Sequence, residues 1–291
     1  MKNIKSRPFS ILGDCGKVYQ FMLDIYERDW RNSVPAPFFE YAYASFAYWQ
    51  DITYSYKNRI WEENGEIVAF CFYENPRCEI LFSLKPGYEE LASEMISYAE
   101  KCMCVDGYIK LRLIGNQTSL IEAAKKSGYH KTWESHEMIF DFQNALDYPL
   151  PDGFHFVEPQ ELNVDKIGKC CWKGFDHEEE EGEWNYQYNQ SNYQLQVAPH
   201  ATMELSVAVA DENGEYACYA GMWWTPQNKL AYMEPLCTVP EHRHKGLAAA
   251  ALSELYRRTK TLGATHMTGG ENEFYKAIGY NSAVKWTYWE K

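Results

Sequence analysis

The segment Tyr232-Met-Glu-Pro-Leu-Cys-Thr-Val239 and the adjoining Pro240-Glu-His-Arg-His-Lys-Gly-Leu-Ala248 carry the clearest structural signal in the chain. They predict a strand that leads through a basic turn into an alanine-rich helix. The first N–H groups of a helix lack intrahelical partners, and the helix dipole adds roughly half a positive charge there. Gly246 leaves room for a phosphate to approach the backbone. The two segments predict an anion site, although an ordinary helix start with a basic surface turn fits the same residues.

Positive charge gathers at this turn in a chain that is otherwise acidic. Arg243, His244 and Lys245 follow one another, whereas the 291 residues hold 41 Asp and Glu against 28 Lys and Arg, a net charge of −13. A surface of that sign repels phosphate backbones, which argues against a general nucleic-acid binder. The length fits two domains of ordinary size.

A second segment, Asn272-Glu-Phe-Tyr-Lys-Ala-Ile-Gly-Tyr280, lies one expected helix and one expected strand downstream of the turn. Together the two segments resemble the GNAT superfamily of acetyl-CoA-dependent N-acetyltransferases. Arg243-His-Lys-Gly-Leu-Ala248 is similar to its pyrophosphate-binding motif, (Gln/Arg)-x-x-Gly-x-(Gly/Ala). Phe274-Tyr-Lys-Ala-Ile-Gly-Tyr280 is similar to its C-terminal Tyr-x-x-x-Gly-(Phe/Tyr) signature. The resemblance covers residues 154–291.

The resemblance implies roles for individual positions. The strand backbone at Leu236, Cys237 and Val239 is expected to bind the pantetheine arm of acetyl-CoA. Tyr275 is expected to protonate the leaving thiolate, and its alternative role is aromatic packing of the last helix onto the sheet. Thr268 stands where many members have an Asn, so Asn272 is expected to substitute as a cofactor contact. The loop amides that would hold the pyrophosphate belong to Arg243, His244, Lys245, Gly246, Leu247 and Ala248.

N-acetylation also requires that the amine lose a proton before or during its attack on the thioester. Glu234 lies on the same expected strand, at the position where several family members place a general base. Pro235 indicates a bulge that turns this carboxylate toward the cleft. A solvent-facing strand glutamate is the competing interpretation.

The sequence indicates the acceptor amine less specifically than it indicates the acetyl-CoA site. In the family that the chain resembles, the segment after the first helix walls the acceptor pocket, and here it contains Asp176-His-Glu-Glu-Glu-Glu-Gly-Glu183. Its carboxylates favour a cationic amine such as a polyamine, an aminoglycoside or a lysine side chain, although a charge run is also typical of a solvated loop. Nearby aromatic residues are candidates to stack on a substrate: Trp184, Tyr186, Tyr188 and Tyr193.

Strand and helix patterns alternate along the chain, and the same element order occurs twice, which predicts a tandem duplication. Asn64-Gly65 and Asn213-Gly214 predict two tight hairpin turns. Helices are expected at residues 18–28, 38–49, 88–101, 117–126, 162–172, 246–262 and 271–278. Strands are expected at residues 59–63, 66–73, 78–82, 108–114, 132–142, 205–210, 217–224, 231–239, 264–268 and 282–289.

The expected fold is α/β (α+β), with two tandem GNAT-like domains, each a mixed, mostly antiparallel central sheet flanked by helices. Asp147-Tyr-Pro-Leu-Pro-Asp-Gly153 is the best linker by composition. We therefore expect a degenerate domain over residues 1–146, a linker over 147–153 and a catalytic domain over 154–291.

The first half can be laid on the same plan, with Cys78 to Ser83 as its pantetheine strand. The next segment lacks basic residues at the corresponding turn and places Glu89 and Glu90 at the helix start, where they would repel a pyrophosphate. Lys126-Ser-Gly-Tyr129 repeats the closing Gly-aromatic pair. We expect a GNAT-like domain that does not bind the cofactor and shapes the acceptor pocket, or alternatively an unrelated α+β domain.

Two classes of function fit these expectations. The first is an N-acetyltransferase that transfers acetyl from acetyl-CoA to a primary amine of a small molecule or peptide, by direct attack in a ternary complex. The second is a non-catalytic acyl-CoA-binding module that regulates or binds a partner. Keeping Tyr275 together with the basic turn favours the enzyme. A homo-oligomer is compatible with both.

Cofactors other than acetyl-CoA are not indicated. The nine cysteines include Cys170-Cys171 and Cys102-x-Cys104, neither of which has metal-ligand spacing, so reduced thiols and no metal are expected. No apolar run approaches the roughly 18 residues that cross a bilayer, and the first residues lack the apolar core of a secretory signal. These features predict a cytoplasmic protein with no membrane partner.

Overall fold

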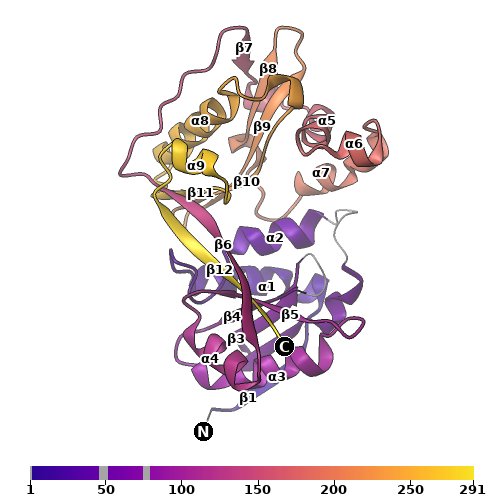
Figure 1. Cartoon of the computed structure of the whole chain (residues 1–291), viewed down its shortest axis with the longest axis vertical. Coiled ribbons are helices and arrows are strands. Elements are labelled where there is room, and N and C mark those ends of the chain that lie inside the picture. Colours follow the sequence, from indigo (N-terminus) through magenta and orange to yellow (C-terminus); the bar gives the residue numbers. More distant parts are fainter. Residues whose placement is uncertain (1, 46–51, 75–78) are drawn as a thin grey trace. The chain divides into compact units, whose positions relative to one another are not determined.

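The computed structural model describes residues 2–45, 52–74 and 79–291 of the chain. The chain divides into two compact units, Met1–Glu137 with Ala283–Lys291 (unit 1) and Met138–Ser282 (unit 2). Each unit has a mixed, mostly antiparallel sheet flanked by helices, as predicted (Figure 1). Every helix in the described residues is too short or too polar to span a membrane.

In unit 1 all neighbouring strands are antiparallel except β4 and β5, whose described residues pair in parallel through Glu79–Lys110 and Ile80–Leu111. The strand order is β1 (Ile4–Pro8), β2 (Arg59–Glu63), β3 (Glu66–Tyr73), β4 (Glu79–Leu84), β5 (Lys110–Ile114) and β12 (Ser282–Glu290). Its α-helices are α1 (Ile11–Asp24), α2 (Ala36–Ser45), α3 (Ala92–Cys102) and α4 (Thr118–Lys126).

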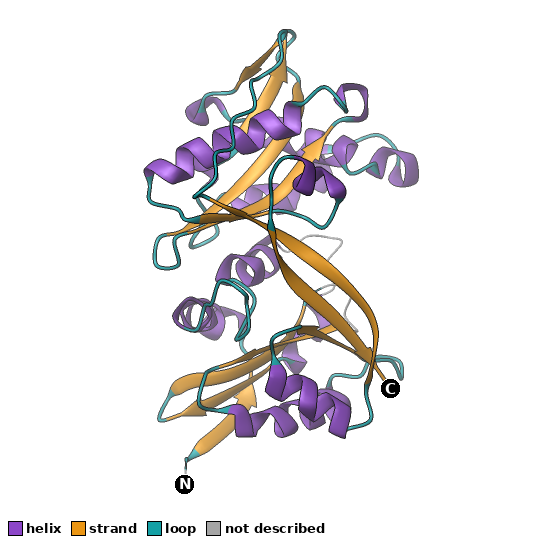
Figure 2. Ribbon diagram, turned by 60° about the vertical axis from the view of Figure 1, so that its left-hand side comes forward, coloured by secondary structure: helices purple, strands orange, loops and turns teal. Residues whose placement is uncertain are grey.

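Unit 2 repeats this plan, with the parallel pair formed by β10 and β11. The strand order is β7 (Phe154–Phe156), β8 (Val207–Asp211), β9 (Tyr216–Thr225), β10 (Leu230–Thr238), β11 (His266–Thr268) and β6 (His130–Asp141). The helices are α5 (Val164–Gly174), α6 (His177–Glu181), α7 (Gln190–Leu195), α8 (Leu247–Thr261) and α9 (Glu273–Ala277). Helices α5 and α8 lie on either side of the sheet, and Figure 2 shows α8 lying across the strands.

The sixth strand of each unit comes from the other half of the sequence. Strand β6 follows α4 of unit 1, yet its end pairs with β11 of unit 2, with Phe140 opposite Met267. Strand β12 follows α9 of unit 2 and pairs with β5 of unit 1, with Thr287 opposite Leu113. The units therefore divide the chain differently from the expected 1–146, 147–153 and 154–291, and residues 147–153 lie inside unit 2. Proline and glycine content indicates where the chain leaves regular structure, but it does not show which sheet a strand joins.

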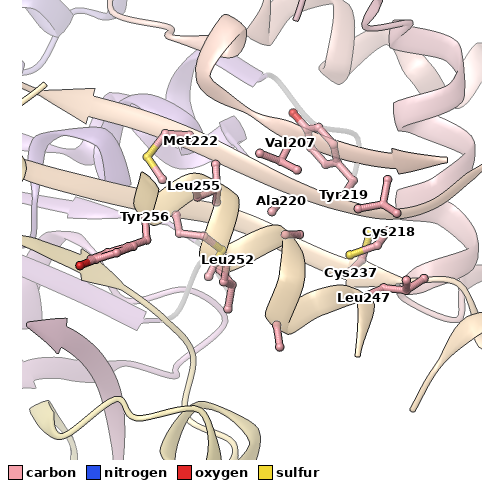
Figure 3. Close-up of a cluster of buried hydrophobic side chains, with 14 of the residues drawn as sticks. Val207, Cys218, Tyr219, Ala220, Met222, Cys237, Leu247, Leu252, Leu255 and Tyr256 are labelled. Carbon is pink, nitrogen blue, oxygen red and sulfur yellow. The ribbon is translucent and has the colours of Figure 1, made fainter. Parts of the chain in front are cut away.

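The core of unit 2 holds the β10–α8 connection in place. Leu247, Leu252 and Leu255 of α8 are buried against side chains of β8, β9 and β10 (Figure 3). The run of alanines that includes Ala250 and Ala251, both fully buried, lets this helix lie close to the sheet. The start of α8 is thus fixed by packing along its own length.

The expected helices and strands are present, and most of their ends lie within about two residues of the expected ones. Helix α1 differs most, because Gly13 and Gly16 weaken its helical propensity and hide its start at Ile11. Asp14 stabilises this first turn by accepting the Ser10 N–H at 2.9 Å. The edge strands β1 and β7 and the short helices α6 and α7 were not predicted from the sequence. The end of the helix expected at 38–49 and Cys78 of the strand expected at 78–82 lie outside the described residues.

Candidate active site

Strand β10 carries a bulge, as the Glu234–Pro235 pair predicts. Met233 pairs with Met222 of β9 and Leu236 pairs with Ala220, so two residues of β10 lie opposite Gly221 alone. A Cβ at Gly221 would lie 2.1 Å from the carbonyl oxygen of Glu234. The bulge therefore requires a glycine at this position of β9.

A buried hydroxyl group satisfies the backbone where β10 leaves β11. The parallel pairing ends at Ala231–Met267, and the Thr268 Oγ1 then accepts the N–H of Met233 at 2.7 Å. Thr268 is fully buried. Many members of the resembled family have Asn at this position. Here the Thr268 side chain takes the place of a strand-to-strand hydrogen bond beside the bulge.

The turn after β10 ends in an open helix N-terminus. His244 and Gly246 have φ of +62° and +88°, the left-handed region that favours glycine. Gly246 is the N-cap of α8, and no side chain caps it. The intrahelical bonding of α8 begins with the N–H of Ala250 bound to the Gly246 carbonyl, so the preceding amides are directed outward from the helix.

A groove of ≈ 490 Å³ opens at this point of unit 2, which we call the β10–α8 groove. Eight of the residues expected to bind the cofactor line it, together with Tyr275, the expected acid: Leu236 and Cys237 of β10, Arg243, His244 and Gly246 of the turn, Leu247 and Ala248 of α8, and Asn272 and Tyr275 around α9. The amides at the start of α8 therefore border a cavity, which is the arrangement that binds phosphate groups. These residues fit the pyrophosphate of a CoA ester.

The three expected cations of the turn have different surroundings. Arg243 is folded back onto the end of α5, where it donates to the Gly174 carbonyl at 3.0 Å and to the Asp176 carboxylate at 2.7 Å. Its Nε also donates to the Thr238 carbonyl at 3.2 Å. Arg243 therefore fastens the turn to α5 and β10, and Asp176 offsets part of its charge.

Lys245 lies outside the groove. Its Nζ is 2.9 Å from Nδ1 of His242 and 5.9 Å from the ring centre of Phe154. His244 is exposed and lines the groove. Because two of the three cations are engaged elsewhere, the backbone amides and the dipole of α8 are the main attraction for an anion here.

The Tyr275 ring packs directly against two glycines, Gly269 and Gly270. The ring is so close that a Cβ at Gly269 or Gly270 would lie 2.6 Å or 2.8 Å from a ring carbon. It also packs edge-on against Tyr280, with ring centres 5.1 Å apart. The side chain is buried but lines the β10–α8 groove. A rigidly held hydroxyl-bearing ring at a groove suits a proton donor better than a mobile surface tyrosine would.

Asn272 borders the groove as the N-cap of α9. Its Oδ1 accepts the N–H of Phe274 at 3.1 Å, which fixes the first turn of the helix that carries Tyr275. Its capping oxygen is therefore occupied, while its position still allows a contact to a bound molecule through the amide group.

The remaining two expected residues lie apart from the residues that line the groove. Val239 is buried in the core. Glu234 is half-buried at the bulge, on the strand that borders the groove. The structure thus brings most of the expected residues together in the lining of one groove, and the Glu234 carboxylate is not part of that lining.

The acidic tract forms the short helix α6, whose carboxylates at residues 178–181 are exposed. The aromatic candidates after it are engaged within the protein or exposed. Tyr188 stacks on Trp172 with ring centres 4.7 Å apart, and Tyr193 donates to Asp165 at 2.8 Å. Trp184 is half-buried and Tyr186 is exposed. The described tract and its neighbours therefore form a solvated surface rather than a wall of the β10–α8 groove.

Several site residues were not found from the sequence. Thr238 and Ala249 line the groove directly beside the expected motif residues. Gly174, at the end of α5, is close enough that a Cβ there would lie 2.7 Å from Cβ of Cys237. A glycine in a strand pattern opposite Glu-Pro, and the pair Gly269-Gly270 after a short strand, were the available signals. Among the described residues, no group of three or more His, Cys, Asp or Glu side chains is arranged to hold a metal ion.

Part of the sequence and the fold of the chain are similar to those of known proteins. The model of the acetyltransferase (GNAT) family matches residues 169–280. A search of curated proteins found no match. Similar solved structures include a tandem GNAT protein from the clavulanic acid biosynthesis pathway, at 12% identity over 99% of this chain and 98% of that chain, with a TM-score of 0.63.

Two further structures cover nearly the whole chain. They are an acetyltransferase of the GNAT family from Colwellia psychrerythraea (12% identity, 98% of both chains, TM-score 0.61) and a GCN5-related N-acetyltransferase from Sphaerobacter thermophilus (11% identity, 99% of this chain and 95% of that chain, TM-score 0.57). At these identities the likeness shows the fold. Residues 169–280 thus match the GNAT acetyltransferase family, and the fold of the whole chain is similar to that of tandem GNAT proteins.

Proposed function

We propose that the protein is an N-acetyltransferase that uses acetyl-CoA and acts on a primary amine, with its donor site in the β10–α8 groove. The observation that carries the proposal is that three features lie at one groove. They are the uncapped N-terminus of α8, the end of β10 that no longer pairs with β11, and the Tyr275 ring packed against two glycines. A module that only binds acyl-CoA needs the first two. Tyr275 is the feature that favours catalysis.

The phosphate end of the donor is assigned to the start of α8. Leu247, Ala248 and Ala249 line the groove at their unpaired amides, and Gly246 adds no side chain in front of them. The pantetheine arm is assigned to the strand backbone at Leu236 and Cys237, because β10 no longer pairs with β11 there. Both contacts are mainly to backbone groups, which leaves side chains free to set acceptor choice.

The chemical step needs a proton acceptor for the amine and a proton donor for the thiolate. The amine nitrogen attacks the thioester carbonyl carbon and loses a proton, and the C–S bond breaks as the thiolate takes the proton of Tyr275. Glu234 is assigned as the general base, because the bulge takes its backbone out of the regular pairing with β9. The path from the amine to Glu234 includes a water molecule, since the carboxylate is not part of the groove lining.

A cationic acceptor is the best first choice for a substrate panel. The chain carries 13 more acidic than basic charges, which raises the local concentration of polyamines, aminoglycosides and lysine-containing peptides. Partner macromolecules are not part of the proposal.

The test is release of free CoA thiol from acetyl-CoA by the full chain, measured against such an amine panel. Turnover that requires an amine supports the proposal. Tight binding of acetyl-CoA without turnover on any amine would contradict it and favour the non-catalytic acyl-CoA-binding module.

The base assignment is tested separately. Glu234→Gln should lower kcat/KM by about 10²–10⁴-fold at neutral pH and remove the acidic limb of the pH profile. Glu241→Gln, an exposed carboxylate in the turn after β10, is the matched control and should leave the profile unchanged. A Glu234→Gln enzyme with the parent pH profile would remove Glu234 from the mechanism.

A further inference from the structure

Three cysteine sulfur atoms meet between α5 and β10, beside the β10–α8 groove. The Sγ atom of Cys237 lies 3.9 Å from the Sγ atoms of both Cys170 and Cys171. Cys170 and Cys171 are neighbours on α5, and Cys237 lies on β10. All three are free thiols.

The end of α5 packs closely against Cys237 of β10. Because Gly174 has no side chain, the last turn of α5 lies against Cys237, and a Cβ at Gly174 would lie 3.0 Å from the Cys237 sulfur. A disulfide bond is about 2.05 Å long, so one pair of sulfur atoms must approach by roughly 1.9 Å.

The three thiols differ in access and reactivity. Cys170 is buried, Cys171 is half-buried, and Cys237 lines the groove although little of its surface is exposed. Hydrogen bonding to Cys170 and Cys171 lowers the pKa of Cys237, and the same hydrogen bonds together with burial raise the pKa of the other two. Cys237 thus combines a lowered pKa with a place in the groove lining, and Cys171 is the less buried of its two neighbouring residues.

We propose that Cys237 and Cys171 are a site of reversible oxidation, in which a peroxide converts the two thiols into a disulfide that links α5 to β10. The Cys237 thiolate attacks one peroxide oxygen, the O–O bond breaks, and the sulfur becomes a sulfenic acid. The Cys171 sulfur then attacks the sulfenic sulfur, and the hydroxyl group leaves as water with the thiol proton. Two thiols and one hydrogen peroxide thus give one disulfide and two water molecules, and a dithiol reductant reverses the reaction.

The cross-link has a consequence for the groove that rests on the proposed function. Gly174 and Cys237 line the same side of the groove, and Arg243 ties the end of α5 to the turn that precedes α8. Drawing the Cys237 side chain toward α5 shifts the part of β10 assigned to the pantetheine arm. Oxidation is therefore expected to weaken acetyl-CoA binding by about tenfold or more.

The test maps the bond in the full chain. The protein is treated with hydrogen peroxide, alkylated, digested with trypsin without reduction and analysed by mass spectrometry. Tryptic cleavage at Lys169, Lys173, Lys229 and Arg243 puts Cys170 and Cys171 in one peptide, Cys237 in another and Cys218 in a third. We expect the peptide of residues 170–173 linked to that of residues 230–243, and we expect the link to disappear with dithiothreitol.

Serine variants identify the partner. Cys170→Ser is the matched control and should keep the cross-link, whereas Cys171→Ser and Cys237→Ser should lose it, with thermal midpoints confirming that each variant is folded. No linked peptide in the oxidised parent, or a link that survives Cys171→Ser and is lost in Cys170→Ser, would overturn the assignment.

Calorimetry of acetyl-CoA with the reduced and oxidised parent tests the consequence. Equal affinities in the two states would overturn the effect on the groove. A reduced protein that binds no acetyl-CoA would overturn the proposed function instead, because the mapped disulfide does not depend on it.

Discussion

The two units have the same strand order. They differ at the start of the helix that follows β10 in unit 2 and β4 in unit 1, which are the strands that enter the parallel pair. In unit 2, β10 leads through a turn to Gly246, the uncapped start of α8. In unit 1, β4 leads to Gly87 and then to a 3₁₀ turn at Glu89–Leu91 before α3. The two glycines have nearly the same φ, +88° and +87°. The backbone thus turns in a similar way at both places, and the charges around it are opposite.

Unit 1 satisfies this turn with its own side chains. The Glu89 carboxylate accepts the N–H of Gly87 at 2.9 Å, and Lys2 pairs with Glu90 at 2.8 Å while donating to the Gly87 carbonyl. A groove of ≈ 330 Å³ is present here as well, but Glu89 and Glu122 line it, and its one arginine, Arg31, is paired with Asp29 at 2.7 Å. Carboxylates at this place complement the α3 dipole and repel a pyrophosphate. This supports the proposal that unit 1 does not bind the donor.

The closing turn shows the same contrast. In unit 2 the N–H of Tyr280 binds the carbonyl of Tyr275 at 3.0 Å, and in unit 1 the N–H of Tyr129 binds the carbonyl of Ala124 at 3.0 Å. The hydrogen bond places Ala124 where unit 2 has its expected acid. The pairing of β3 with β4 also lacks the bulge of β9 and β10. The comparison teaches that the same backbone hydrogen bonds maintain the fold in both units. A few local side chains distinguish the groove of unit 2, which has the expected catalytic residue, from the groove of unit 1, which does not.

The largest effect is expected from removing the Tyr275 hydroxyl, since unit 1 has no hydroxyl at the corresponding residue, Ala124. Tyr275→Phe keeps the packing of the ring against Gly269 and Gly270 and removes only the hydroxyl, so kcat should fall by about 10²–10⁴-fold. Acetyl-CoA affinity should change little, because one neutral hydrogen bond contributes about 1 kcal/mol. Steady-state kinetics and calorimetry measure the two quantities.

The matched control is Tyr280→Phe, in the same motif. The Tyr280 hydroxyl is buried and donates to the Thr268 carbonyl at 3.4 Å, so its loss should leave kcat near the parent value. A Tyr275→Phe enzyme whose kcat stays within twofold of the parent, with chemistry rate-limiting, would show that Tyr275 is only a packing residue.

A smaller effect is expected from the two left-handed glycines. Gly246→Trp should weaken acetyl-CoA binding by at least about tenfold, because the side chain blocks access to charge-assisted hydrogen bonds worth about 1.5–3 kcal/mol each. Gly87→Trp imposes the same backbone strain in unit 1 and should leave affinity unchanged. Equal affinities for the two folded variants, measured by calorimetry, would argue against the placement of the donor.

The smallest effect concerns stability at the β9–β10 bulge, which the β3–β4 pairing of unit 1 lacks. Thr268→Val leaves the buried Met233 N–H without its partner, so the free energy of unfolding should fall by about 1–3 kcal/mol. Thr225→Val removes an equally buried hydroxyl that donates to the Leu230 carbonyl, and it should cost about 0.5–1.5 kcal/mol. Denaturant unfolding followed by fluorescence compares the two. Identical losses would mean that the Thr268 hydroxyl has no special role at the bulge.

The sequence predicted the elements and the groove because both are local. Apolar periodicity marks helices and strands, and the turn from Arg243 to Ala248 places its own amides at a helix start. The bulge at Glu234–Pro235 was predicted for the same reason, since proline interrupts a ladder wherever it occurs.

The remaining features depend on contacts between distant segments. The strand order that puts β6 beside β11 and β12 beside β5 leaves no mark in the composition of residues 147–153. The engagement of Arg243 by Asp176 and the approach of Gly174 to Cys237 depend on how α5 packs against β10. No spacing rule reports such contacts, so the turn was expected to be more cationic than it is.

The most direct test of the comparison between the units is the number of donor sites per chain. Calorimetric titration of the reduced full chain with acetyl-CoA should give one site per chain. Gly246→Trp should weaken that site strongly, and Gly87→Trp should leave it intact. Two equivalent sites per chain, or a single site that is lost in Gly87→Trp and kept in Gly246→Trp, would contradict the assignment of the donor to unit 2 alone.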